Sequence, residues 1–142
     1  MPDRTTADSG TDRIVKRLDV RATRARVWRA LADATEFGAW FGMVLDRPFT
    51  PGAAVVGRLT IPGYEHVSLE MRIEAMEEGR RFAYRWHPYA VDPAIDYAAE
   101  PMTLVEFLLE DAPDGTALTI IESGFDALPA TRRAEAFRRN TG

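Results

Sequence analysis

The sequence predicts an α+β domain in which one antiparallel sheet contains most of the chain. Three observations predict this fold class. Two helical segments follow the first strand pattern, six further strand patterns come without a helix between them, and mostly short connections join those strands. A final helical pattern begins at Pro129, and proline suits the first turn of a helix. The expected order is therefore one strand, two helices, six strands and one helix.

The first elements are predicted by apolar spacing and by capping residues. Apolar side chains alternate over residues 14–20, as in a strand with one buried face. Thr23 is suited to cap a helix over 24–34, because a threonine side chain accepts a backbone N–H of the first turn. Thr35 can cap a second, single-turn helix that ends at Gly42, since glycine adopts the left-handed conformation without strain.

From residue 43 onward the apolar period changes from the helical value to two. The clearest case is 67–74, where apolar and polar residues alternate strictly, which is typical of a half-buried strand. An Asp-Gly pair at 114–115 predicts a tight hairpin between the last two strands. The expected strands are 43–46, 54–61, 67–74, 82–87, 103–111 and 117–123.

The hairpin after 67–74 fixes which side chains face inward. A two-residue turn at Glu78-Gly79 places Ile73 opposite Tyr84 and Met71 opposite Trp86. All four of these side chains then lie on one face of the sheet, as a correct register requires.

The same register decides where the two histidines lie. His87 falls opposite Glu70 on the outer face, and His66 shares the parity of Glu70. Neither imidazole is expected to face the interior, and no third ligand is in view. The sequence therefore predicts no metal site.

The last hairpin places one acid on the inner face. Pairing Asp111 with Thr116 brings Val105 opposite Glu122, so that two apolar layers end in a carboxylate. Lys16 has the inward parity of the first strand. An ion pair between Lys16 and Glu122 is expected if the first and last strands are neighbours.

Composition excludes several classes of protein. The chain has 142 residues and a net charge of −4, which gives one domain and no broad footprint for nucleic acid. Cysteine is absent, which excludes disulfides, a thiolate nucleophile and cysteine-ligated zinc or iron–sulfur sites, and fits the cytoplasm. The longest stretch without a polar side chain, 37–45, is too short to span a membrane. Residues 1–12 are expected to be a disordered tail before one domain at 13–142.

An ordered set of short segments resembles the activator of Hsp90 ATPase homologue-like family. The resemblance covers about residues 12–142. No cofactor is expected, because the sequence lacks a glycine-rich nucleotide-binding fingerprint as well as cysteine. The segments are the strand, turn and Val27-Trp28 within 14–28, Glu36-Phe37 with Trp40-Phe41, the strand 82–86, and 122–125 before the final helix.

The resemblance implies a helix-grip fold of the START-like, or SRPBCC, superfamily. In that fold a curved seven-stranded antiparallel sheet wraps a C-terminal helix, and the two enclose a cavity that often holds apolar ligands. The final helix expected here is shorter than the family's. A partly uncovered cavity would be a surface for self-association or for a chaperone.

Eight side chains are candidates to line that cavity. Each could instead be ordinary core, and Glu122 could be a structural carboxylate or a general acid or base. The segment 88–101 is long enough to be a lid or a cover for the sheet edge. The candidates are Trp40, Phe41, Met71, Tyr84, Trp86, Phe107, Ile120 and Glu122.

Three functions follow from these expectations. The first is non-enzymatic binding of a small hydrophobic or aromatic ligand between the sheet and the C-terminal helix. The second is a chaperone-regulator type of protein interaction through the charged outer face. The third is a cyclase-like or hydrolytic enzyme that uses Glu122. The outer-face residues are Glu70, Arg72, Glu74, Arg85, Glu106 and Glu110.

Overall fold

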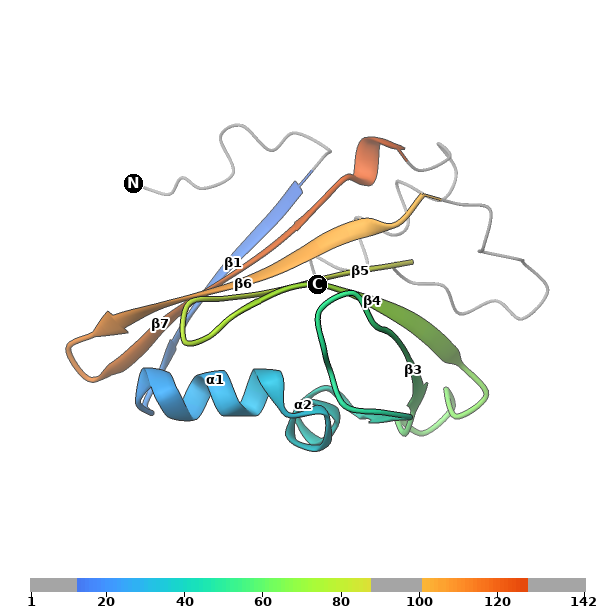
Figure 1. The fold of residues 1–142 in the computed structure, drawn as a ribbon, viewed down its shortest axis with the longest axis horizontal. Coiled ribbons are helices and arrows are strands. Elements are labelled where there is room, and N and C mark those ends of the chain that lie inside the picture. The colour runs from blue at the N-terminus through green and yellow to red at the C-terminus, as the bar shows by residue number, and fades with distance from the viewer. Residues whose placement is uncertain (1–12, 88–100, 128–142) are drawn as a thin grey trace.

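The computed structural model describes residues 13–87 and 101–127 (Figure 1). The expected tail at 1–12, most of the segment 88–101 and the final helix from Pro129 lie outside these ranges. The strands are β1 (Arg13–Val20), β2 (Met43–Leu45), β3 (Ala54–Leu59), β4 (Ser68–Glu77), β5 (Arg81–Trp86), β6 (Thr103–Ala112) and β7 (Gly115–Ser123). The helices are α1 (Arg24–Ala32) and α2 (Ala34–Phe41), and a 3₁₀ turn covers Phe125–Ala127.

The seven strands form one curved antiparallel sheet in the order β1-β7-β6-β5-β4-β3-β2. Strands β2 to β7 each lie beside their neighbours in sequence, and β1 closes the order by pairing with β7. Figure 1 shows α1 and α2 on the same side of this sheet. The α+β class is therefore as predicted, and β1 and β7 are the neighbours that an ion pair between Lys16 and Glu122 would require.

Capping residues set the limits of both helices. The Thr23 side chain accepts the Arg26 N–H at the start of α1, as predicted. The predicted cap of α2 at Thr35 is wrong, because the Asp33 carboxylate accepts the backbone N–H of Thr35 and α2 begins two residues earlier. The helix ends at Gly42, whose φ of 75° is the left-handed conformation expected there.

The predicted two-residue turn between β4 and β5 is also wrong. Glu77 lies opposite Arg81, so that the loop has three residues, 78–80. The Arg80 N–H donates to the Glu77 carbonyl at 2.9 Å, and Gly79, the third residue of this turn, has a φ of 74°. A positive φ at the third position of a β-turn favours glycine, which adopts it without strain.

A β-bulge corrects the register farther along the same hairpin. The pairing shifts by one residue between Ile73 and Ala75, which leaves one extra residue in β4. This extra residue offsets the extra residue of the loop. Ile73 therefore lies opposite Tyr84, as predicted, although the turn from which that pair was deduced is different.

The core lies between α1, α2 and part of the inner sheet face. Phe37 of α2 is only 1% exposed, and its ring centroid lies 6.0 Å from Phe82 and 6.3 Å from Phe107. Leu31 of α1 is fully buried in the same cluster. The helices thus fill one half of the inner face with side chains, and this position decides where a hollow can remain.

Candidate functional site

A hollow of about 220 Å³ lies over the inner face of β1, β7, β6 and β5. Phe41 of α2 forms its helical side, with its ring 6.0 Å from that of Phe107. We call this space the inner hollow. The side chains that line it are Ile14, Lys16, Phe41, Tyr84, Trp86, Val105, Phe107, Ile120 and Glu122.

Strand register brings these residues to one place. Tyr84 lies opposite Val105, Val105 opposite Glu122, and Glu122 opposite Ile14, which makes one row across four strands. Cross-strand partners point to the same face of a sheet. The row therefore places a phenol and a carboxylate on the same apolar floor, with one valine between them.

A parallel row lies next to the first. Lys16 faces Ile120, and Ile120 faces Phe107, so that this row has an ammonium group at its β1 end. Lys16 is exposed, and it lines the inner hollow as its predicted inward parity requires. The inner hollow thus has one cationic and one anionic side chain.

Glu122 accepts hydrogen bonds from residues of β5 and β6. Its Oε2 accepts the Trp86 indole N–H at 2.8 Å and the Thr103 hydroxyl at 2.6 Å. Glu122 is only 8% exposed, and Thr103 is fully buried. A buried carboxylate is costly unless hydrogen bonds compensate, so these two donors stabilise its charge and fix its orientation.

Tyr84 brings a phenol hydroxyl to the inner hollow. The residue is 6% exposed, and within residues 13–87 and 101–127 its hydroxyl has no hydrogen-bond partner. Burial raises the pKa of Tyr84 far above its ordinary value, and the negative charge of Glu122 raises it further. The side chain therefore stays a neutral phenol that can both donate and accept.

The structure brings together six of the eight predicted lining residues, namely Phe41, Tyr84, Trp86, Phe107, Ile120 and Glu122. The expectation for Met71 is wrong, because Met71 is fully buried in the core, opposite Val55 of β3. The expectation for Trp40 is also wrong, because this ring is 43% exposed and stacks on Phe41 at 5.1 Å. Neighbouring helix residues point about 100° apart, so only one of the pair can face the sheet.

Three residues of the site were not among the predicted ones. Ile14 and Val105 line the inner hollow, and the Thr103 hydroxyl binds Glu122. The sequence contained a signal for these positions, because all three residues have the parity of the inward-facing side chains of their strands. Thr103 was missed because the inward parity of polar residues was applied to Glu122 and Lys16 but not to this hydroxyl.

The histidines lie apart from this site. His66 is exposed in the connection between β3 and β4, and His87 follows β5 directly. Neither side chain lines the inner hollow. In the part of the chain that the structure describes, no cluster of His, Asp or Glu could hold a metal ion.

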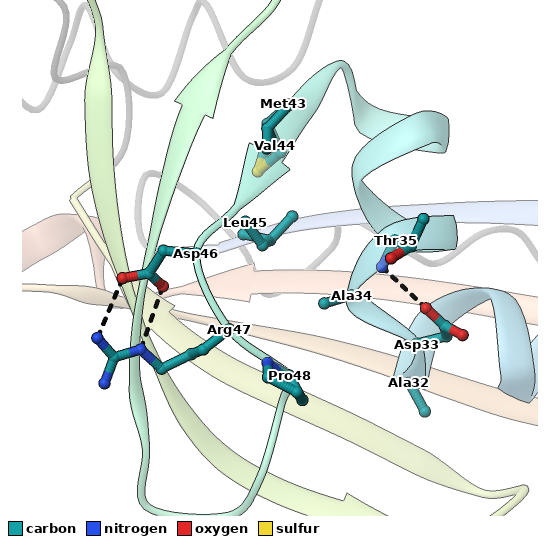
Figure 2. A pocket seen from close by; sticks show the side chains of 10 residues that line it. All are labelled: Ala32, Asp33, Ala34, Thr35, Met43, Val44, Leu45, Asp46, Arg47 and Pro48. Carbon is teal, nitrogen blue, oxygen red and sulfur yellow. Dashed lines mark hydrogen bonds and ion pairs between the residues drawn. The ribbon is translucent and has the colours of Figure 1, made fainter.

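A larger hollow of about 540 Å³ lies between the α1–α2 junction and β2 (Figure 2). Its acids already have structural roles. Asp33 caps α2, and Asp46 accepts the Val56 N–H at 3.0 Å and pairs with Arg47. These bonds lower the pKa of Asp46, first through the backbone N–H and then through the guanidinium. These two acids therefore stabilise α2 and the strands next to it. For this reason we do not choose this hollow as the candidate site.

A third hollow, of about 750 Å³, lies on the outer face near β1, β7 and β6. Two of its arginines have local partners. Arg24 donates to Asp111 at 3.0 Å and to the Gly79 carbonyl at 2.9 Å, and Arg80 pairs with Glu77. This hollow is mainly a contact between the strand ends and the start of α1.

The acids expected on the outer face are largely paired. Glu106 binds Arg81 at 2.8 Å, and the pKa of Arg81 is raised by that bond. The other pairs are Glu70 with Arg72 at 3.0 Å and Glu74 with Arg85 at 3.2 Å. The outer face is thus a mosaic of ion pairs instead of a patch of one sign.

The sequence matches a family described as Activator of Hsp90 ATPase homolog 1-like protein over residues 21–141. The match includes α1, α2, all strands from β2 to β7 and every inner-hollow residue outside β1. The chain belongs to this family. The resemblance read from the sequence is therefore confirmed.

Solved structures of family-like proteins share this fold. Protein MLL2253 from Mesorhizobium loti is 22% identical, with a TM-score of 0.69 over 91% of this chain and 85% of that one. A protein from Rhodobacter sphaeroides is 25% identical, with a TM-score of 0.65 over 89% and 80% of the two chains. The Aha1 dimer from Colwellia psychrerythraea is 11% identical, with a TM-score of 0.63 over 90% and 87%. No curated protein matches the sequence.

These likenesses show that the chain shares the fold of these proteins. Of the helices within residues 13–87 and 101–127, none is both long and apolar enough to cross a membrane.

Proposed function

We propose that this family member binds a small hydrophobic or aromatic molecule in the inner hollow, without catalysis, in the cytoplasm. One observation carries the proposal: the inner hollow has aromatic and aliphatic walls and a buried carboxylate at one position. An apolar concave site with few convergent polar groups is typical of small-molecule binding. Contact of the ligand with Phe41, Tyr84, Trp86, Phe107 and Ile120 would supply the apolar free energy of binding.

The size of the inner hollow limits the ligand. Its volume of about 220 Å³ is below the range of roughly 300–1,000 Å³ that drug-sized ligands occupy. An apolar cavity of about 150 Å³ can hold a benzene molecule. The inner hollow therefore suits a single substituted ring or a short chain.

The arrangement of Glu122 favours binding over hydrolysis. Its Oε2 is occupied by Trp86 and Thr103, which hold it as a fixed acceptor. Among the described lining residues there is no second carboxylate and no imidazole. Paired acid and base chemistry, as in glycoside hydrolysis, would need such a partner.

A thermal-shift screen of single-ring aromatic compounds tests the proposal. We expect some of these compounds to raise the melting temperature of the full chain, because a ligand that binds only the folded state stabilises it. The Trp86→Ala variant should lose this shift. Trp40→Ala, which removes an exposed tryptophan outside the inner hollow, should keep it. A panel without any shift, or a shift that survives Trp86→Ala, would contradict ligand binding at this place.

Family membership supports a second candidate, a chaperone-regulator type of protein interaction or self-association. The similar protein from Colwellia psychrerythraea is described as a dimer. The charges of the outer face are paired with one another, so this surface would discriminate between partner proteins by charge less than the sequence suggests. Stimulation of an Hsp90 ATPase by the purified chain, or a concentration-dependent dimer in ultracentrifugation, would support this candidate.

A further inference from the structure

We infer that the inner hollow prefers an aromatic monocarboxylate, whose ring lies on Ile120 and Phe107 and whose carboxylate binds the Lys16 ammonium group. This inference rests on the proposed function and names its ligand class. It is carried by a row of side chains that is apolar at its buried end and cationic at its exposed end.

This row runs across the sheet from the core to the edge strand β1. Phe82 faces Phe107, and Phe107 faces Ile120. Ile120 in turn faces Lys16. Phe82 is fully buried and Phe107 is only 2% exposed, whereas Ile120 is half-buried and Lys16 is exposed. The row is therefore closed and apolar at its core end, and open and cationic at β1.

A ligand with one apolar and one anionic end matches this row. Two strand spacings, roughly 10 Å, separate Lys16 from Phe107. A single ring can thus lie over Ile120 while its substituent reaches the ammonium group. The ring gains free energy from apolar burial at the inner end. The charged substituent stays at the exposed end, where water still solvates it, so that little of its hydration is lost.

The Lys16 ammonium group is available for such a partner. Within residues 13–87 and 101–127 Lys16 has no ion pair, so the expected pair with Glu122 is not formed. A ligand carboxylate that contacts the ammonium group gains a charge-assisted hydrogen bond. Because Lys16 is exposed, this gain is modest and is screened by salt.

Glu122 does not cancel this preference. It lies in the neighbouring row, opposite Ile14, which is two residues from Lys16 along β1, a spacing of roughly 7 Å. Coulomb energy falls with distance, so a carboxylate in contact with Lys16 is attracted more strongly than Glu122 repels it. A cationic ligand would meet Lys16 at the exposed end, and it could approach Glu122 only by losing its water in the apolar interior.

A matched set of three ligands tests this preference. Para-toluate, para-toluamide and para-methylbenzylamine share one methylated ring and differ in the charge of the polar substituent. Their dissociation constants for the full chain can be measured by NMR titration at pH 7 and low ionic strength. We expect para-toluate to bind about fivefold more tightly than para-toluamide, as one exposed ion pair allows. The amine should bind more weakly than the amide, and added salt should bring the acid and the amide together.

Substitutions at two neighbouring positions of β1 locate the preference. Lys16→Met removes the charge and keeps a long apolar stem, so the acid and the amide should then bind within about twofold of each other. Lys16→Glu should make the amine bind more tightly than the acid. Arg17→Met is the matched control, because Arg17 is also exposed and has no ion pair among the described residues, but borders the outer-face hollow. This control should keep the fivefold preference.

The outcomes separate this inference from the proposal on which it rests. Equal binding of para-toluate and para-toluamide by the natural sequence would overturn the preference for an acid and leave apolar binding standing. Tightest binding of the amine would do the same, as would a preference that survives Lys16→Met or is lost equally in Arg17→Met. Failure of all three compounds to bind would overturn ligand binding itself. The three dissociation constants of the natural sequence and their salt dependence decide the matter even if a variant does not fold.

Discussion

Two halves of the inner sheet face differ in what covers them. In the packed half, Phe37 of α2 lies against Phe82, and Leu118 is buried beside Leu109. In the open half, Trp86 and Ile120 lie on the same strands as Phe82 and Leu118 but line the inner hollow. The strands present apolar side chains in both halves. The difference teaches that the covering helix, and not the strand pattern, decides whether such a side chain is buried in the core or lines the inner hollow.

The largest effect on stability is expected from removing a large side chain from the packed half. Phe37→Ala removes a ring that contacts those of Phe82, Tyr84, Phe107 and Phe49. We expect a loss of about 3–5 kcal/mol in the free energy of unfolding, because a buried phenylalanine leaves a cavity. Urea unfolding followed by circular dichroism measures it. A loss below about 1 kcal/mol would show that the packed half is not tightly filled.

A second effect compares two buried threonine hydroxyls. Thr103 donates to the Glu122 carboxylate, and Thr116 donates at 2.7 Å to the Ala22 carbonyl. Thr103→Val should cost about 1.5–3 kcal/mol, and Thr116→Val about 0.5–1.5 kcal/mol, because hydrogen bonds to charged groups are stronger. Equal losses in urea unfolding would contradict a stronger hydrogen bond at Thr103.

Enlarging one residue in each half tests the contrast directly. Leu118→Phe should cost about 1–3 kcal/mol, because the packed half has no room for the larger ring. Ile120→Phe should change the free energy of unfolding by less than about 1 kcal/mol, because its ring can enter the inner hollow. The same variant should lose the thermal shift given by aromatic ligands. Similar losses of stability for both variants would show that the open half is already filled.

The smallest effect concerns the hollow beside β2, whose acids serve the fold. The pKa of Asp46 is lowered by the Val56 N–H and by Arg47, so its ionised form stabilises the folded state. A carboxylate with a lowered pKa contributes above the pH at which it ionises when unfolded, about 4, and this contribution is lost as the pH falls through the folded value. Asp46→Asn should therefore be slightly less stable than the natural sequence at pH 7 in urea unfolding, and this difference should shrink as the pH falls below about 4. A difference that persists at acidic pH would contradict this role.

The sequence was sufficient for the fold because alternation and turn residues agreed over long stretches. The Asp-Gly turn predicted the register that places Val105 opposite Glu122. In the β4–β5 hairpin the predicted turn was one residue too short, yet Ile73 still faces Tyr84 because the bulge restores the parity. A bulge depends on the twist of the whole sheet, and residue patterns alone do not reveal it.

The site was less predictable for a physical reason. Alternation tells which face a side chain occupies but not what lies above it. Met71 and Trp86 both face inward, yet one is fully buried in the core and the other lines the inner hollow. The position of α2 makes this difference, and that position depends on contacts between residues far apart in the chain.

The position of β1 has a consequence for access to the inner hollow. This strand contributes Ile14 and Lys16 to its wall, and in the sheet as described it is an edge strand that pairs only with β7. Edge elements open at a lower free energy than the central strands of a sheet. Fraying of β1 would therefore open the inner hollow at the edge of the sheet. A bound ligand would slow the exchange of β1 amide hydrogens with deuterium. Ligand access to the inner hollow would then depend on the opening of β1, while β7 stays in the sheet.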